Sequence, residues 1–300
     1  MCKRLLFLKT ENNLQFVVIN NKLKHMSNWD IDLDIPQSEF VEMPESLEDL
    51  MSVPVSTLDE LLSLYYNLAY FRALRGYRYL YRGHSSSSYS LQPTISRTSN
   101  ASKENESHIY NRFKQICRNS ECAQFKLDNS NEDLYYMSIA RHLGLKSRLL
   151  DWTAGFWIAL SFLLYDNLDL DGTLWIIAQK NDIPLENTSP LEIKDDDVHF
   201  FKETCVIPEN KLLNDLPLGL ARSYRQHSYF TATSLHNTLI PLNNLQGSKD
   251  IEFYHVTIPA NLKKQLLECE NIIDVNLWLY LRREDTLINS VNELNELFEV

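Results

Sequence analysis

The alternation of apolar and polar positions predicts a hairpin at the start of the chain. Residues 4–20 contain two apolar runs separated by Asn12 and Asn13. Asparagine favours turns, so two short strands around this pair are expected. The acidic stretch 26–54 follows and contains three prolines. We expect it to form a linker or an arm that lies over the surface.

Helical spacing begins after residue 56. Thr57 and Glu60 are three positions apart, as in a capping box that satisfies the first free N–H groups of a helix. Apolar side chains recur behind them at intervals of three and four residues: Leu58, Leu61, Leu62, Tyr65, Leu68 and Ala69. The same spacing predicts further helices over residues 107–125, 131–143, 154–166 and 259–268, and helical patterns in the tail, 272–299.

Short apolar runs between these helices predict strands at residues 77–81, 149–152, 173–178, 203–207, 228–233 and 251–258. Residues 98–107 and 181–200 are expected to be polar loops, and the acidic run 195–197 is interpreted as solvated. Because strands and helices do not alternate regularly, a repeated βαβ fold is not indicated. The predicted fold class is α+β, with a mixed or antiparallel sheet core and surrounding helices. We divide the chain into residues 1–55 and 56–300.

Charge and composition narrow the function. The formal net charge of the 300 residues is −11, which disfavours broad, nonspecific binding to nucleic acid. A local basic patch remains an alternative, because residues 141–148 hold three basic groups. Glycine-rich phosphate loops and the common hydrolase and metalloprotease motifs are absent from the sequence. The five cysteines form no CxxC pair, so neither a metal site nor a disulfide framework is predicted.

The apolar stretches are too short for a membrane protein. The longest, residues 156–165, cannot span a bilayer, and the first, near residue 5, is too short for a signal sequence. We therefore expect a cytoplasmic protein with no membrane partner.

The most informative stretch is residues 140–153. It crowds a histidine, two arginines, an aspartate, a tryptophan and a threonine together, directly before the apolar segment 156–165. Polar groups next to a buried segment are costly unless they pair or serve a purpose. This stretch is therefore the candidate site.

Together with an upstream segment, this stretch resembles the FRG domain, a family named after the Phe/Tyr-Arg-Gly at its start. The first matching block is Tyr81-Arg82-Gly83, followed at the family's spacing by Leu91, Pro93, Ile95 and Arg97. The second and more specific block matches at His142, Gly144, Arg148, Leu149, Leu150, Asp151, Trp152 and Thr153. A third block, residues 222–231, resembles the family's Arg-Ile-x-x-Gln-x-Gly-x-Phe-Thr. The resemblance covers roughly residues 56–285.

The chain departs from the family pattern at several positions. Arg141 replaces the usual Gln of the second block, and His84 stands where a Gln is frequent. The other departures are Leu143, Lys146, Ser147 and Ser228. They bear on the substrate more than on the fold.

The order of these blocks is also similar to that of ADP-ribosyltransferases. Arg82 resembles the first-strand Arg that orients NAD in those enzymes, and Thr153 takes the place of the second strand's Thr. Gln226 lies near the position of their catalytic Glu. The resemblance implies an ADP-ribosyltransferase-like fold, with NAD as the cofactor and Arg82, His142, Thr153 and Gln226 as the catalytic set.

The expected NAD-binding residues are Tyr81, Arg82, Gly83, Ser85, Asp151 and Trp152. An Arg before a Gly and a serine run presents a rigid fork to phosphate, and the Gly lets a ligand approach the backbone. Each has a structural alternative. The alternative for Arg82 is a core ion pair with Asp151, for which Arg148 is the other candidate partner. Trp152 is either a core residue or a stacking surface, and Tyr81 is a second candidate for the stacking surface. His142 is either a general base or a structural hydrogen-bonding residue. Glu203, Glu252 or Asp151 are further candidates for the acid.

The resemblance implies a bacterial toxin in anti-phage defence that modifies RNA, DNA or protein. Such a toxin needs a neutralising antitoxin or chaperone protein, and the stretch 26–54 is a candidate docking segment. A noncatalytic module that binds a nucleotide or a partner is the alternative. A nuclease ranks lower, because the matched blocks contain one carboxylate, Asp151, and metal-dependent cleavage uses clustered carboxylates.

Overall fold

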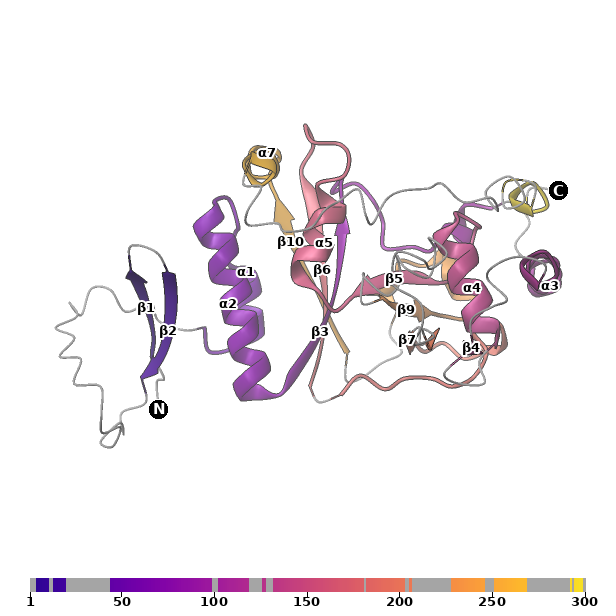
Figure 1. Cartoon of the computed structure of the whole chain (residues 1–300), viewed down its shortest axis with the longest axis horizontal. Helices are drawn as coiled ribbons and strands as arrows, with labels where there is room; N and C mark the ends of the chain where they lie inside the picture. Colours follow the sequence, from indigo (N-terminus) through magenta and orange to yellow (C-terminus); the bar gives the residue numbers. More distant parts are fainter. Residues whose placement is uncertain are drawn as a thin grey trace.

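The structure is a computed structural model, and it describes residues 4–10, 13–19, 44–98, 102–118, 126–127, 132–180, 182–202, 205–206, 228–245, 251–268, 292 and 294–298. Within these ranges the chain has an α+β fold, as predicted (Figure 1). None of the helices found there is long and apolar enough to cross a membrane.

The core is a six-stranded sheet in the order β10-β6-β3-β5-β9-β7, in which every neighbouring pair is antiparallel. The strands are β3 (Tyr77–His84), β5 (Leu150–Thr153), β6 (Gly172–Lys180), β7 (His199–Lys202), β9 (Ser228–Ala232) and β10 (Ile251–Ile258). Most of these strands were predicted within a few residues, but β7 begins inside the predicted loop 181–200.

The sheet consists of two halves that are joined at one residue pair. β3 pairs with β6 from Tyr77↔Lys180 to His84↔Thr173, and β5 pairs with β9 along its whole length. By contrast, β3 and β5 share the single pair Tyr81↔Thr153. The two halves, β10-β6-β3 and β5-β9-β7, are therefore paired with each other only at these two residues in the described part of the chain, and they diverge beyond them. Figure 1 shows the two halves side by side.

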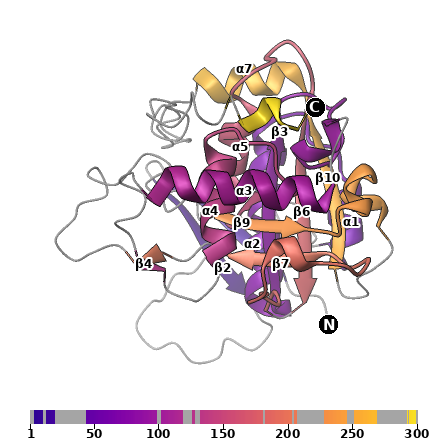
Figure 2. The same cartoon turned by 90° about the vertical axis from the view of Figure 1, so that its right-hand side faces the viewer.

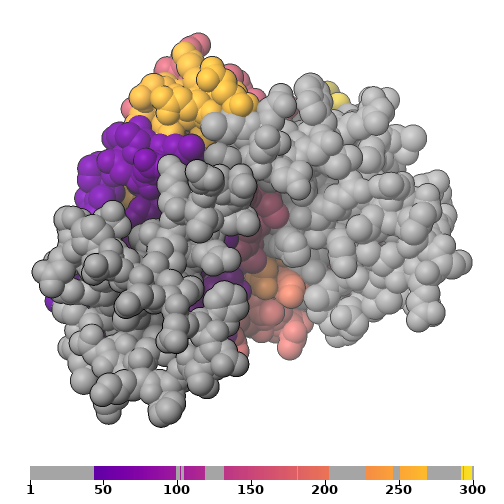
Figure 3. Space-filling view, turned by 60° about the vertical axis from the view of Figure 1, so that its left-hand side comes forward, coloured from indigo at the N-terminus to yellow at the C-terminus, as the bar shows by residue number. Residues whose placement is uncertain are grey.

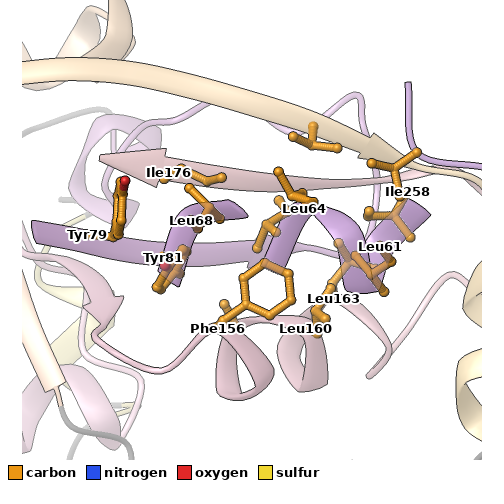
Figure 4. Packing of buried hydrophobic residues seen from close by; sticks show 14 of the residues in the cluster. Leu61, Leu64, Leu68, Tyr79, Tyr81, Phe156, Leu160, Leu163, Ile176 and Ile258 are labelled. Carbon is orange, nitrogen blue, oxygen red and sulfur yellow. The ribbon is translucent and has the colours of Figure 1, made fainter. Parts of the chain in front are cut away.

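Four helices pack on the first half: α1 (Leu47–Ser52), α2 (Leu58–Arg75), α5 (Phe156–Leu163) and α7 (Ala260–Glu268). The predicted capping box of α2 is confirmed, because Thr57 and Glu60 each accept from the other's backbone N–H. Figure 4 shows part of the shared cluster, in which side chains of α2 and α5 pack with those of β3, and Tyr81 lies beside Phe156. Figure 3 shows α7 next to the surface of the α1–α2 region, in keeping with the contact between α2 and α7.

The second half is covered by α3 (Lys103–Arg118) and α4 (Glu132–His142), which contact each other. Both helices lie in front of β9 and β7 in Figure 2. Their apolar side chains pack with Phe201 of β7 and Phe230 of β9 in a second core cluster.

Smaller elements complete the described part of the chain. The predicted hairpin is confirmed, with β1 (Arg4–Thr10) antiparallel to β2 (Asn13–Ile19). A second short pair joins β4 (Lys126–Leu127) to β8 (Cys205–Val206), which lies within the predicted strand 203–207. Turns of 3-10 helix are η2 (Thr94–Arg97), η4 (Pro190–Glu192), η6 (His236–Leu239) and η7 (Leu242–Asn244).

The structure corrects two loop predictions. The end of the predicted arm 26–54 forms α1, which begins with a capping box between Ser46 and Asp49 and buries Leu47 and Leu50 in the core. The polar segment 98–107 contains the start of α3, where the Ser102 hydroxyl accepts from the Asn105 N–H at 3.1 Å. In both places a short local cap outweighs a polar composition. Most of the predicted tail, 272–299, lies outside the described residues.

Candidate functional site

A cavity of about 420 Å³ lies where β3 and β5 separate. Its lining combines parts of all three sequence blocks: Tyr81, Arg82, Gly83, His84, Ser85, Tyr89, Arg141, His142, Gly144, Asp151, Trp152, Thr153, Phe162, Tyr165 and Ser228. Strand pairing brings the three blocks together, because Tyr81 pairs with Thr153, which in turn pairs with Ser228. Every predicted catalytic or NAD-binding residue that the structure describes therefore lies at this cavity, and Gln226 lies outside the described residues.

Arg82 is held by contacts at both sides of its guanidinium group. Its Nε donates to Nε2 of His84 at 3.0 Å, and its Nη1 donates to the backbone oxygen of Asp151 at 2.7 Å. Nη1 also lies 3.6 Å from the Asp151 carboxylate. Burial lowers the pKa of Arg82 to about 10, although Asp151 opposes that shift, so Arg82 stays charged at neutral pH. A charged, pre-oriented fork is suited to an anion.

His84 is neutral in this arrangement. Burial, together with the positive charge of Arg82, lowers its pKa to about 3. Because Nε of Arg82 is a donor, Nε2 of His84 must be the unprotonated nitrogen that accepts. The ring therefore acts as an acceptor that fixes Arg82 and adds no charge to the site.

Asp151 is shared by two arginines. Its Oδ2 lies 2.8 Å from Nη2 of Arg141 and 3.6 Å from Nη1 of Arg82. The predicted pairing with Arg82 is confirmed, whereas the alternative pairing with Arg148 is wrong. Arg148 is buried between α3 and β5, where its Nε donates to both carboxylate oxygens of Glu106 at 3.0 Å.

Two of the three basic residues in 141–148 do not contribute to a surface patch. Arg141 turns to the cavity and Arg148 to the core. Lys146 alone does not make a basic patch there.

His142 and Thr153 both line the cavity and have neighbours that constrain them. Thr153 is buried, and its hydroxyl accepts from the Gly155 N–H at 3.0 Å, at the entrance to α5. The ring centroid of His142 lies 6.1 Å from that of Phe230. His142 is thus placed at the site by the end of α4, while Thr153 also supports the turn into α5.

The rings of Tyr81 and Trp152 belong to the core. Tyr81 packs edge-on against Phe156, with 5.5 Å between ring centroids. Trp152 is 3% exposed, and its indole N–H donates to the Thr231 hydroxyl at 2.9 Å. Both placements favour the structural alternative over a stacking surface.

Gly83 has a packing role. A Cβ at this position would lie 2.0 Å from the backbone oxygen of Ala159, so only glycine allows α5 to lie this close to β3. Gly83 also lines the cavity, so the expectation that it lets a ligand approach stays a prediction beside this packing role. Ser85 sits on the rim, where its hydroxyl accepts from the Asn167 side chain at 3.1 Å.

The candidates for the catalytic acid are mostly unplaced. Gln226 and Glu203 lie outside the described residues, although Ser228, two positions after Gln226, lines the cavity. Glu252 is exposed on β10, which β6 separates from β3. Among the described lining residues Asp151 is the one carboxylate, and both arginines bind it.

Several lining residues were missed in the sequence. His84 could have been found, because in a strand it lies on the same face as Arg82, two positions away. Arg141 was singled out as a departure from the family pattern but was given no role. Tyr89, Phe162 and Tyr165 carry no sequence signal of their own and reach the cavity through the path of the chain.

The part of the chain that the structure describes contains no cluster of metal-donor side chains. No group of three His, Cys, Asp or Glu side chains suited to a metal ion occurs there.

Comparisons with known proteins give one match. No curated protein and no solved structure matches the chain significantly. The matching family covers β3, the second block and α5, and it ends just before β6. Over residues 77–171, the chain matches the FRG domain family.

Proposed function

We propose that the chain binds NAD in the cavity between β3 and β5 and transfers ADP-ribose to a macromolecule. The observation that carries the proposal is the orientation of Arg82. A charged guanidinium is locked by His84 and Asp151 at the wall of a cavity that a nucleotide-sized ligand can enter. Arg82 would hold the diphosphate of NAD by charge-assisted hydrogen bonds.

The reaction breaks the bond between the ribose C1′ and the nicotinamide nitrogen. Nicotinamide leaves with the bonding electron pair, an acceptor atom bonds to C1′, and the acceptor gives up its proton. An oxocarbenium-like state develops on the way, as in glycoside cleavage. His142 lies at the cavity wall and is the described residue best placed to take the proton.

The catalytic group that polarises the ribose is assigned to the third block. Gln226 precedes Ser228 by two residues, and Ser228 is at the cavity. The resemblance to FRG and ADP-ribosyltransferase proteins supports a role as a toxin in anti-phage defence, with a neutralising protein as partner.

A noncatalytic binding module is the second candidate. It is favoured by Asp151, since the carboxylate at the described part of the cavity is engaged by Arg82 and Arg141. Such a module would bind the same ligand but would release no nicotinamide.

A transfer assay tests the proposal. The purified chain is incubated with adenine-labelled NAD and a bacterial extract, and the products are separated into protein, RNA and DNA fractions. Arg82→Lys keeps the charge but loses the fork. Arg78→Lys is the matched control, because Arg78 lies on the same strand and pairs with Asp182 at the surface.

Label in one fraction that is lost with Arg82→Lys and kept with Arg78→Lys supports a transferase and identifies the acceptor class. Bound NAD without label or nicotinamide release supports the binding module. Growth arrest on expression, relieved by Arg82→Lys and by Gln226→Ala, would link the activity to toxicity.

A further inference from the structure

Among the described lining residues, the cavity carries more positive charge than negative charge. Arg82 and Arg141 are both cations, Asp151 is one anion, and His84 is neutral, so these groups sum to +1. The chain as a whole has a formal charge of −11. A positive centre in an acidic protein attracts an anion to one place.

Arg141 is the residue in excess. Asp151 is already contacted by Arg82 through its backbone oxygen and its carboxylate. One arginine would neutralise it, yet the positive charge of Arg141 also acts on Arg82 and lowers the pKa of Arg82 further. Arg97 acts in the same direction. Like charges gathered at one cavity are unfavourable without a counterion.

Arg141 also has an unused donor. Its Nε is buried and has no hydrogen-bond partner among the described residues, while its Nη2 binds Asp151. A buried N–H without an acceptor is destabilising, and a bound anion would supply the missing acceptor. Arg82 differs, because its Nε is satisfied by His84.

Exposed aromatic rings accompany the two arginines. Tyr89 and Tyr165 line the cavity and are 46% and 58% exposed, and the hydroxyl of Tyr89 accepts from Asn167 at 3.1 Å. Flat, accessible rings beside cations suit a ligand that combines phosphate with a base.

We propose that Arg141 is a second phosphate-binding residue, so that the cavity selects nucleoside diphosphates and their derivatives over monophosphates. This inference rests on the site of the proposed function but not on its chemistry. Arg82 holds one phosphate from β3, and Arg141 holds the other from the end of α4. Tyr89 and Tyr165 contact the base.

Calorimetric titration with ADP and AMP tests this assignment on the full chain. The wild type is expected to bind ADP at least about tenfold more tightly than AMP, because the second phosphate adds a charge-assisted contact with Arg141. Arg141→Gln should remove most of that preference and leave AMP affinity within about twofold. Arg141→Lys, which keeps the charge, should retain part of it, and Arg78→Gln should change nothing.

Three results would overturn the assignment: a wild type that binds neither nucleotide, equal affinities for ADP and AMP, or an equal loss of both in Arg141→Gln. Arg141→Lys decides the matter if Arg141→Gln does not fold. The test is separable from transferase activity because ADP is not a donor. An ADP preference that depends on Arg141, without nicotinamide release from NAD, would reject the transferase alone. Transfer of ADP-ribose, together with a preference for ADP over AMP that Arg141→Gln leaves unchanged, would reject this inference alone.

Discussion

Nε of Arg82 donates to Nε2 of His84 across 3.0 Å, two positions along the same strand. The bond requires a neutral imidazole, because a protonated ring has no acceptor. His84 has a pKa of about 3, lowered by burial and by Arg82, and so stays neutral across the physiological range. The position of Arg82 therefore depends on the protonation state of its neighbour.

This dependence predicts acid sensitivity. The pKa of His84 is about 3 in the folded chain, against about 6.5 for an unperturbed histidine. Between these values the unfolded chain binds more protons, so the free energy of unfolding falls as pH drops, by up to about 1.4 kcal/mol per pH unit. His84→Gln keeps an acceptor but does not titrate. Urea unfolding from pH 7 to pH 4 should show a shallower decline for His84→Gln, and parallel declines would refute the assignment.

The buried pair Arg148–Glu106 should be essential to stability. Both side chains are almost fully inaccessible, and Nη1 of Arg148 also donates to the Pro190 oxygen at 3.2 Å. Glu106→Gln or Arg148→Met leaves its partner uncompensated and should cost about 3–5 kcal/mol in urea unfolding. The double variant Glu106→Leu/Arg148→Met should cost much less than the sum of the costs of the two single variants. Arg118→Met breaks the exposed pair with Glu132 and should cost at most about 1 kcal/mol. A similar cost for both pairs would contradict this account.

Gly83→Ala should destabilise the contact between β3 and α5. The added methyl group meets the backbone oxygen of Ala159 at 2.0 Å, and backbone cannot rotate away as a side chain can. A loss of about 1–3 kcal/mol is expected, measured as a lower urea midpoint. Gly76→Asn is the comparison, because nothing lies within 4 Å of a Cβ there, so any loss it shows comes from its φ of 76° and not from a clash. If Gly83→Ala matches the wild type, close packing is not the reason for glycine here.

Lys263 should stabilise the rim of the cavity. Its buried Nζ donates to the backbone oxygens of Ser85 and Asn167 at 2.8 Å and of Leu170 at 3.0 Å. These oxygens belong to the segments after β3 and before β6, and Ser85 lines the cavity. Lys263→Met removes these bonds and a longer one to the Asp166 oxygen at 3.4 Å, so amide hydrogen exchange should accelerate in residues 85–89 and 166–171. Lys264→Met, which breaks an exposed pair with Asp169, should leave exchange there unchanged. Equal exchange in both variants would argue against this role.

Local patterns predicted much of this fold and missed part of the site. The α2 capping box is a local signal, and both α2 and the strand predicted at residues 251–258 formed where expected. Glu106 lies in a stretch that appears fully polar, and its burial depends on Arg148, 42 residues away. The two arginines on Asp151 come from different elements, which spacing alone does not bring together. Pairing across long sequence distances is set by tertiary packing and not by periodicity.

The central claim is that Arg82 holds NAD in the cavity between β3 and β5. Isothermal titration of NAD into the wild type, Arg82→Lys and Arg78→Lys tests it most directly. The account predicts binding by the wild type, a loss of about tenfold or more in Arg82→Lys, and an unchanged affinity in Arg78→Lys. Absence of NAD binding, or equal affinities in the wild type and Arg82→Lys, would contradict it.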